Sequence, residues 1–174
     1  MKPDTVGRPD GSDAARPPNQ VTDHATGHAT GLATGLCAVG LLLTAAGERP
    51  VGALRPGDRV ITRDAGMVTL RALTRRRLHT PLVRIRAGSL GHRRPGRDAL
   101  LPACQPILLR DWRAHALFGR AQILVAAARL VDGEFVTHEG TGALDLCQLD
   151  FGAPHILYLD GLEVASHAAG ALVP

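Results

Sequence analysis

The sequence predicts an all-β fold, a compact and curled β-sheet domain with one or two short helical turns. From residue 37 onward, short apolar runs are separated by Gly, Pro and Asp, which is typical of strands joined by tight turns. The 174 residues suffice for about one ordinary domain. Three Phe, one Trp and one Tyr are the only large aromatic residues, so we expect an aliphatic core.

The expected strands are separated by clear turn signals. Glycine and aspartate at 56–58 and 64–66 indicate two chain reversals, and Gly57 is free to adopt a positive φ. We expect strands at 41–44, 59–62, 68–73, 82–86, 107–110, 123–126, 144–149 and 155–159, with helical turns at 113–118 and 126–130. The residues expected to be buried include Leu41, Leu43, Val60, Val83, Ile85, Leu108, Ile123, Val125, Leu146 and Ile156.

The first 36 residues differ in composition from the rest of the chain. They contain clustered Pro and Gly and a four-residue tandem repeat at 24–35, and a Gly in every copy disfavours both helix and strand. We predict that residues 1–36 are a disordered Pro/Gly/Thr-rich leader. Residues 37–174 then form the folded domain.

Charge and hydropathy narrow the choice of partners and compartment. The longest apolar run, at 36–46, is about half the length of a membrane span, and it lies too far from the N-terminus for a secretory signal. We therefore expect no membrane association and a cytoplasmic protein.

The net charge is +4, and nine arginines fall within 71–97. They offer a surface for acidic partners, although no aromatic residues lie among them for base stacking, so we do not expect nucleic acid as a partner.

An ordered series of short motifs identifies a family. Cys37 is followed by Gly40 and later by Leu54, Gly57 and Asp58, and this opening resembles that of hedgehog/intein (Hint) domains. Further segments resemble stand-alone bacterial Hint-type proteins in the same order, at 84–91, 97–101, 117–119, 123–127 and 159–162. The resemblance covers about residues 37–170.

The resemblance implies an autoprocessing reaction at the bond between Leu36 and Cys37. In active members, the Cys thiolate attacks the preceding amide in an N–S acyl shift, and the resulting thioester is opened by an external nucleophile. Cys37 is the implied nucleophile, and the N-terminal segment of the same chain is the implied substrate. We expect no cofactor, and the spacing of the His and Cys residues predicts no metal site.

Several residues depart from the motifs of active members. The same alignment places Pro102 where a Ser or Thr is expected and Gln105 where a His protonates the scissile amide. Gln148 replaces a second His, and 164–166 lack the usual carboxylate. A Gln side chain forms hydrogen bonds but delivers no proton at neutral pH. We therefore expect the autoprocessing activity to be impaired or lost.

Other residues offer alternatives. His155 is a catalytic candidate if it rotates into the place of a lost imidazole, and the alternative is a histidine at a strand end or on the surface; His167 lies near it in sequence. Cys104 and Cys147 suit buried apolar positions, and nothing in the spacing requires zinc. The only Asn is Asn19, so we expect no splicing. The alternative function is a non-enzymatic binding module with an arginine-rich face for acidic partners.

Overall fold

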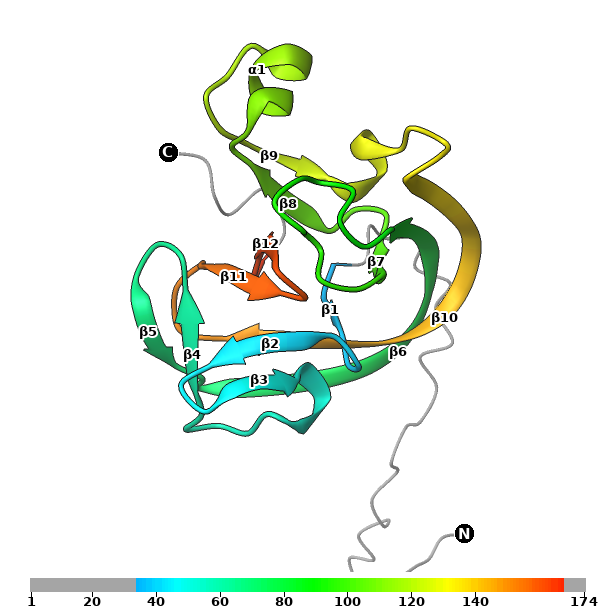
Figure 1. Cartoon of the computed structure of the whole chain (residues 1–174). Coiled ribbons are helices and arrows are strands. Elements are labelled where there is room, and N and C mark those ends of the chain that lie inside the picture. Colours follow the sequence, from blue (N-terminus) through cyan, green and yellow to red (C-terminus); the bar gives the residue numbers. More distant parts are fainter. Residues whose placement is uncertain (1–33, 168–174) are drawn as a thin grey trace, which may run out of the picture.

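The computed structural model describes residues 34–167, and these residues form an all-β fold with one α-helix, as the sequence predicts (Figure 1). Residues 1–33 of the predicted disordered leader lie outside the described part, but its last residue, Leu36, is buried in a strand, so the predicted boundary at residue 36 is too late. The strands are β1 (Leu36–Cys37), β2 (Leu41–Thr44), β3 (Gly47–Pro50), β4 (Arg59–Thr62), β5 (Gly66–Thr69), β6 (Ala72–Ile85), β7 (Ala99–Pro102), β8 (Pro106–Leu109), β9 (Ile123–Ala126), β10 (Val136–Asp150), β11 (Ile156–Leu159) and β12 (Leu162–Ala165).

The strands form two antiparallel sheets. One has the order β1-β10-β6-β7, and the other runs β3-β2-β4-β11-β12-β8-β9, with β5 paired to β4. Figure 1 shows β6 and β10 side by side as a long curved ribbon, and they pair from Ile85 with Val136 to Ala72 with Asp150. The short strand β1 lies against the second half of β10, which places the start of the domain at a sheet edge.

The predicted strand positions are largely confirmed, but their lengths are not. The structure has β2, β4 and β9 within the predicted limits, whereas the runs at 82–86 and 144–149 are only parts of β6 and β10. The run at 68–73 is divided between β5 and β6. Much of the β6 ribbon is exposed on both faces, so its side chains show no alternation of apolar and polar residues that could predict a strand.

The core is aliphatic, as expected, but four of the predicted core residues are only partly buried. Leu41, Leu43, Leu108 and Ile123 are of intermediate exposure, while their neighbours Leu42, Ile107 and Leu109 are buried. A run of consecutive apolar residues does not reveal which of two alternating faces is inward, and the prediction took the wrong phase in β2 and β8. Ile123 lies on the same face as the buried Val125 but packs only at the margin of the core. Val60, Val83, Ile85, Val125, Leu146 and Ile156 are buried as predicted.

The turns follow their sequence signals. Gly57 has a φ of 96°, and the Asp58 N–H donates to the Arg55 carbonyl at 3.0 Å, which closes the first predicted turn. Gly66, with a φ of 68°, closes the β4–β5 hairpin. Asp160 and Gly161 both have positive φ between the paired residues Leu159 and Leu162, the geometry that Asp-Gly favours in a two-residue hairpin.

Both predicted helical turns are present. The helix α1 (Trp112–Phe118) begins after Asp111, whose carboxylate accepts from the Arg113 N–H at 3.0 Å, and ends at Gly119 in the left-handed region. A 3-10 turn covers Ala127–Leu130, and another covers Val51–Ala53. In the described part of the chain, no helix combines the length and the apolar character that a bilayer span requires.

Candidate functional site

The bond predicted to react lies within a sheet and not in a loop. Leu36 and Cys37 form β1, where Leu36 is paired with Cys147 and Cys37 with Leu146 of β10. Both β1 residues are buried, with 2% and 7% of their surfaces exposed. The peptide bond before Cys37 is therefore fixed in position and largely shielded from water.

The register of β1 determines which backbone groups face this bond. The Ala38 N–H donates to the Asp145 carbonyl at 2.9 Å, which makes these residues a hydrogen-bonded pair. Hydrogen-bonded pairs alternate along antiparallel strands, so Leu36 and Cys147 form the next one. The Cys147 N–H is thereby directed at the Leu36 carbonyl oxygen, where it would stabilise negative charge that develops there.

A tight turn follows Cys37. The Cys37 carbonyl accepts from the Gly40 N–H at 2.9 Å. A Cβ atom at Gly40 would lie 2.8 Å from Leu159 Cδ1 and 3.1 Å from the Cys37 oxygen, so no larger residue fits without displacing its neighbours. This close packing is the physical reason for a glycine three residues after the cysteine.

The same turn is held from outside by an ion pair. Arg97 Nε donates to Asp160 Oδ1 at 2.6 Å, and Arg97 Nη2 donates to the Val39 carbonyl at 2.7 Å. The Leu41 N–H also donates to Asp160 Oδ1, at 3.0 Å. We call Arg97 and Asp160 the turn clamp. Sequence reasoning did not assign it a role, although both residues lie in segments that carry the family resemblance.

Gln105 contacts the residues that precede the reactive bond. Its side chain is 1% exposed, and its Oε1 accepts from the Gly35 N–H at 3.1 Å. Its Nε2 donates to the Ala165 carbonyl at 2.8 Å. Pro102 ends β7, and its carbonyl accepts the Gln105 N–H at 2.9 Å. Gln105 thus links the end of the leader to the end of β12, but it has no group that could protonate the Cys37 nitrogen.

The three cysteines are free thiols with different surroundings. Cys147 is fully buried; desolvation raises the pKa of its thiol, with Cys37 and Asp145 adding to the rise and Arg75 opposing it. Partial burial likewise raises the pKa of Cys104. These two side chains remain neutral thiols at physiological pH, which suits the predicted role as apolar fillers.

His155, the second candidate catalytic residue, makes contacts away from β1. Its Nδ1 lies 2.7 Å from Asp64 Oδ2, and its ring packs edge-on against Phe151 at 5.8 Å between centroids. Burial tends to raise the pKa of Asp64, but hydrogen bonds from the Ile156 N–H and the His155 ring outweigh this effect and lower it. No hydrogen bond or ring contact among residues 34–167 joins His155 to Cys37, so its catalytic role stays a prediction.

Another histidine lies closer to the leader. His167 Nδ1 is 2.8 Å from Ser166 Oγ, and both residues line a cavity together with Thr34 and Gln148. Gln148, predicted to replace a family His, is exposed and paired with Thr74. The sequence singled out His167 only as a neighbour of His155, because its approach to the leader depends on the fold.

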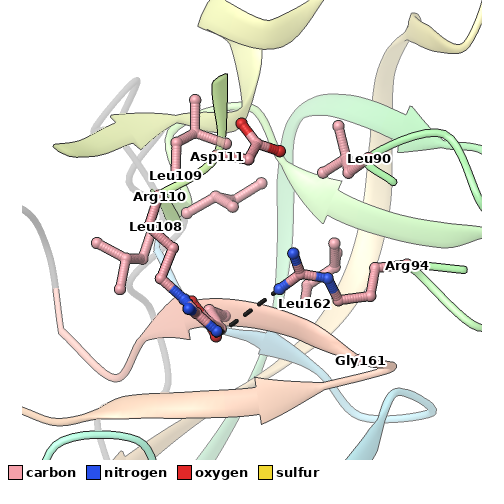
Figure 2. Close-up of a pocket in the computed structure, with 10 residues that line it drawn as sticks. Leu90, Arg94, Leu108, Leu109, Arg110, Asp111, Gly161 and Leu162 are labelled. Carbon is pink, nitrogen blue, oxygen red and sulfur yellow. Dashed lines mark hydrogen bonds and ion pairs between the residues drawn. The ribbon is translucent and has the colours of Figure 1, made fainter. Parts of the chain in front are cut away.

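The buried carboxylate of Glu163, on β12, is surrounded by arginines. Glu163 is 3% exposed and is held by Arg110 at 2.7 Å, with Arg63 and Arg94 at 3.6 and 3.7 Å. Glu163 lines a small pocket, and Figure 2 shows Arg94 and Arg110 at this pocket. Its volume of about 20 Å³ is sufficient for a single water. Hydrogen bonding to Glu163 raises the pKa of Arg110. This pocket is too small to be a substrate site.

The arginine-rich stretch is interleaved with acidic residues. Arg84 pairs with Glu139 at 3.0 Å, and Arg75 and Arg77 both approach Asp145, at 3.3 and 3.7 Å. These pairs reduce the positive potential that the sequence alone implies. Within residues 34–167, no group of three or more His, Cys, Asp or Glu side chains is arranged to hold a metal ion.

Comparisons with known proteins agree with this architecture. A family model described as Hint domain matches residues 35–171. Among solved structures, the chain is similar to the TvoVMA intein, with 14% identity, a TM-score of 0.54, and coverage of 78% of this chain and 98% of that one. It is also similar to the bacterial intein-like domain from Clostridium thermocellum, with 17% identity, a TM-score of 0.50, and coverage of 78% and 99%. No curated protein matches the chain. At these identities, the two structural likenesses concern the fold alone.

Proposed function

Because the chain belongs to the Hint domain family, we propose that it is an autoprocessing domain that cleaves its own Leu36–Cys37 bond slowly, with Cys37 as nucleophile. Its substrate is the N-terminal segment of the same chain. Residues 37–174 contain no Asn that could cyclise to release the domain, so the proposed outcome is cleavage without splicing.

The first step is an N–S acyl shift. The Cys37 thiolate attacks the Leu36 carbonyl carbon and forms a C–S bond, and the C–N bond to Cys37 breaks. The thiol proton is released and the Cys37 nitrogen takes up a proton, so the product is a thioester beside a free α-amine. A nucleophile such as water or a thiol then opens the thioester and separates residues 1–36 from residues 37–174.

One observation carries this proposal. The Gly35 N–H donates to Gln105 Oε1, which anchors the segment before Cys37 in a buried position next to the sheet. The Cys147 N–H directed at the Leu36 carbonyl supports the same step, because a backbone donor at this oxygen stabilises a tetrahedral oxyanion. The turn clamp supports it further by holding the backbone on the other side of Cys37.

The same site explains why cleavage would be slow. An amide nitrogen is a poor leaving group unless it is protonated as the bond breaks. The family resemblance predicts the general acid at the position of Gln105, and a carboxamide delivers no proton. General acid–base catalysis contributes about 10²–10⁴-fold in rate, and the proposed site works without that contribution.

The test is the intact mass of the full-length chain, incubated for days with and without dithiothreitol or hydroxylamine. We expect two fragments, residues 1–36 and 37–174, to accumulate slowly, and hydroxylamine to increase their yield because it opens thioesters. Cys37→Ala should abolish the reaction, whereas Cys104→Ala serves as a matched control that retains it. The proposal fails if hydroxylamine yields no fragments from a correctly folded wild-type chain; the binding-module alternative then becomes the stronger hypothesis.

A further inference from the structure

A cavity of about 370 Å³ opens beside the segment that precedes the reactive bond. The leader contributes Thr34 to its wall, and the residues after β12 contribute Ser166 and His167. Thr74, Gln148 and Asp150 add further polar groups from β6 and β10. Since a water molecule occupies about 30 Å³ in the liquid, the cavity has room for several waters or for one small polar molecule.

Ser166 and His167 are arranged for proton transfer. Ser166 Oγ accepts from the backbone N–H of His155 at 3.0 Å, which leaves the hydroxyl hydrogen free to donate elsewhere. The His167 Nδ1 lies 2.8 Å from the same oxygen. In the tautomer that carries its proton on Nε2, the imidazole accepts the Ser166 hydroxyl hydrogen. A hydroxyl hydrogen-bonded to a basic imidazole is the arrangement by which a proton is withdrawn from a nucleophile.

The pair is linked through one side chain to the segment that carries the acyl group. Gln105 bonds to Gly35 and to Ala165, so a single side chain links the residue before Leu36 to the residue before Ser166. Thr34 lines the cavity, and two residues of extended chain, about 7 Å, separate it from Leu36. The cavity therefore lies beside the backbone that leads into the Leu36–Cys37 bond, although neither of these two residues lines it.

We infer that Ser166 and His167 form a proton relay for the water molecule that opens the Leu36–Cys37 thioester. This inference rests on the proposed function and adds to it the acceptor and the groups that activate it. Gln105 holds the acyl segment and the turn clamp holds the backbone after Cys37, and the relay serves the second step. The imidazole absent from the first step is thus present for hydrolysis.

The step balances without any added reagent. Water in the cavity gives a proton to Ser166 Oγ as the serine hydroxyl hydrogen passes to His167 Nδ1. The water oxygen forms a bond to the Leu36 carbonyl carbon, and the bond from that carbon to Cys37 Sγ breaks. His167 then returns the proton to the Cys37 thiolate, so the products are a carboxylic acid at Leu36 and a free thiol.

The test separates hydrolysis from thioester formation. Hydroxylamine attacks a thioester without needing a base, whereas neutral water is a poor nucleophile and depends on proton removal. The full-length chain is incubated in buffer alone and in hydroxylamine, and the mass of the 1–36 fragment distinguishes carboxylate from hydroxamate. We expect His167→Gln to lower the hydrolysis rate by about 100-fold or more and to change the hydroxylamine-dependent rate less than about twofold.

Control variants guard against a purely structural effect. His115→Ala removes an exposed imidazole on α1 and should leave both rates unchanged. Ser166→Thr retains the hydroxyl and should retain hydrolysis, whereas Ser166→Ala should lose it. This serine pair also provides the test if His167→Gln does not fold.

Each other outcome overturns the relay. If His167→Gln lowers both rates equally, the residue acts in folding or in thioester formation. If it lowers neither, or if the wild type reacts only with hydroxylamine, the cavity does not activate water. If hydroxylamine yields no fragments from the wild type, the proposed function itself has failed, and this result is distinct from the preceding ones.

Discussion

The two sides of the Leu36–Cys37 bond differ in how completely they are built. On the Cys37 side, the Gly40 turn and the turn clamp fix the backbone with short hydrogen bonds. On the Leu36 side, Gln105 forms hydrogen bonds at the position where the family resemblance predicts an acid. The contrast indicates that holding the reactive backbone and supplying its proton are separate requirements, since the first can be satisfied without the second.

The strongest test of this comparison restores the predicted acid. Gln105→His combined with Pro102→Thr should accelerate cleavage by about 10²–10⁴-fold, because an imidazole can protonate the Cys37 nitrogen as the amide breaks. The rate is measured from intact masses over time. Cys37→Ala in the same background must abolish the gain. Unchanged cleavage in a folded double variant would show that Gln105 does not occupy the acid position.

The next test removes the turn clamp on the Cys37 side of the bond. Asp160→Ala leaves the Leu41 N–H and the Arg97 guanidinium without their carboxylate, and one buried donor without a partner costs about 1–3 kcal/mol. Urea denaturation should show this loss, and hydroxylamine-dependent cleavage should slow. Asp160→Asn is the matched control, because Asn tolerates the positive φ and its Oδ1 can still accept. Equal stability of the Ala variant and the wild type would contradict the role of the clamp.

A comparable loss of stability should follow from filling the space at the turn. Gly40→Ala places a methyl group 2.8 Å from Leu159 Cδ1, and overpacking of this kind costs about 1–3 kcal/mol. Thermal unfolding measures the change. Gly96→Ala is the control, since the nearest atom to its added Cβ would lie 4.0 Å away. If both variants unfold at the same temperature, close packing is not the reason for a glycine after Cys37.

The sequence predicts the fold class and the strand positions better than it predicts how the strands meet. Alternation and turn residues place β2, β4 and β9, because these short strands lie between clear punctuation. The lengths of β6 and β10 are missed, since a ribbon exposed on both faces needs no apolar alternation. The prediction assigns Leu41 and Leu108 to the wrong face for the opposite reason, because the residues next to them in the strand are apolar and no alternation marks the buried face.

The candidate site divides in the same way. The family resemblance singles out Cys37, and it predicts that Gln105 lies near the leader. Both follow because the order of the motifs fixes which residues align with the family's site. The turn clamp joins residues 63 apart in the sequence, and the cavity joins Thr34 to His167. Such pairings arise from sheet topology, which local patterns do not encode.

A variant of His155 tests whether this histidine has taken over the role of the family His that Gln105 replaces. Its ring is engaged with Asp64 and Phe151, so we expect His155→Ala to change hydroxylamine-dependent cleavage less than about threefold. The variant should lose stability instead, by about 1 kcal/mol or less for a partly exposed pair. A loss of cleavage with unchanged stability would assign His155 the catalytic role and revise the position of Gln105.

The smallest effect concerns the carboxylate partner of His155. Because hydrogen bonds lower the pKa of Asp64 in the folded chain, its contribution to stability is present above the unfolded value of about 3.9 and is lost as the pH falls through the folded value. Asp64→Asn should therefore be less stable than the wild type at neutral pH, by about 1 kcal/mol or less because the carboxylate is partly exposed. The difference should shrink below about pH 4, as the wild-type carboxylate becomes protonated.

Urea denaturation across this range measures it, with Glu48→Gln on the exposed strand β3 as control. A difference that stays constant with pH would show that the negative charge of Asp64 contributes nothing to stability.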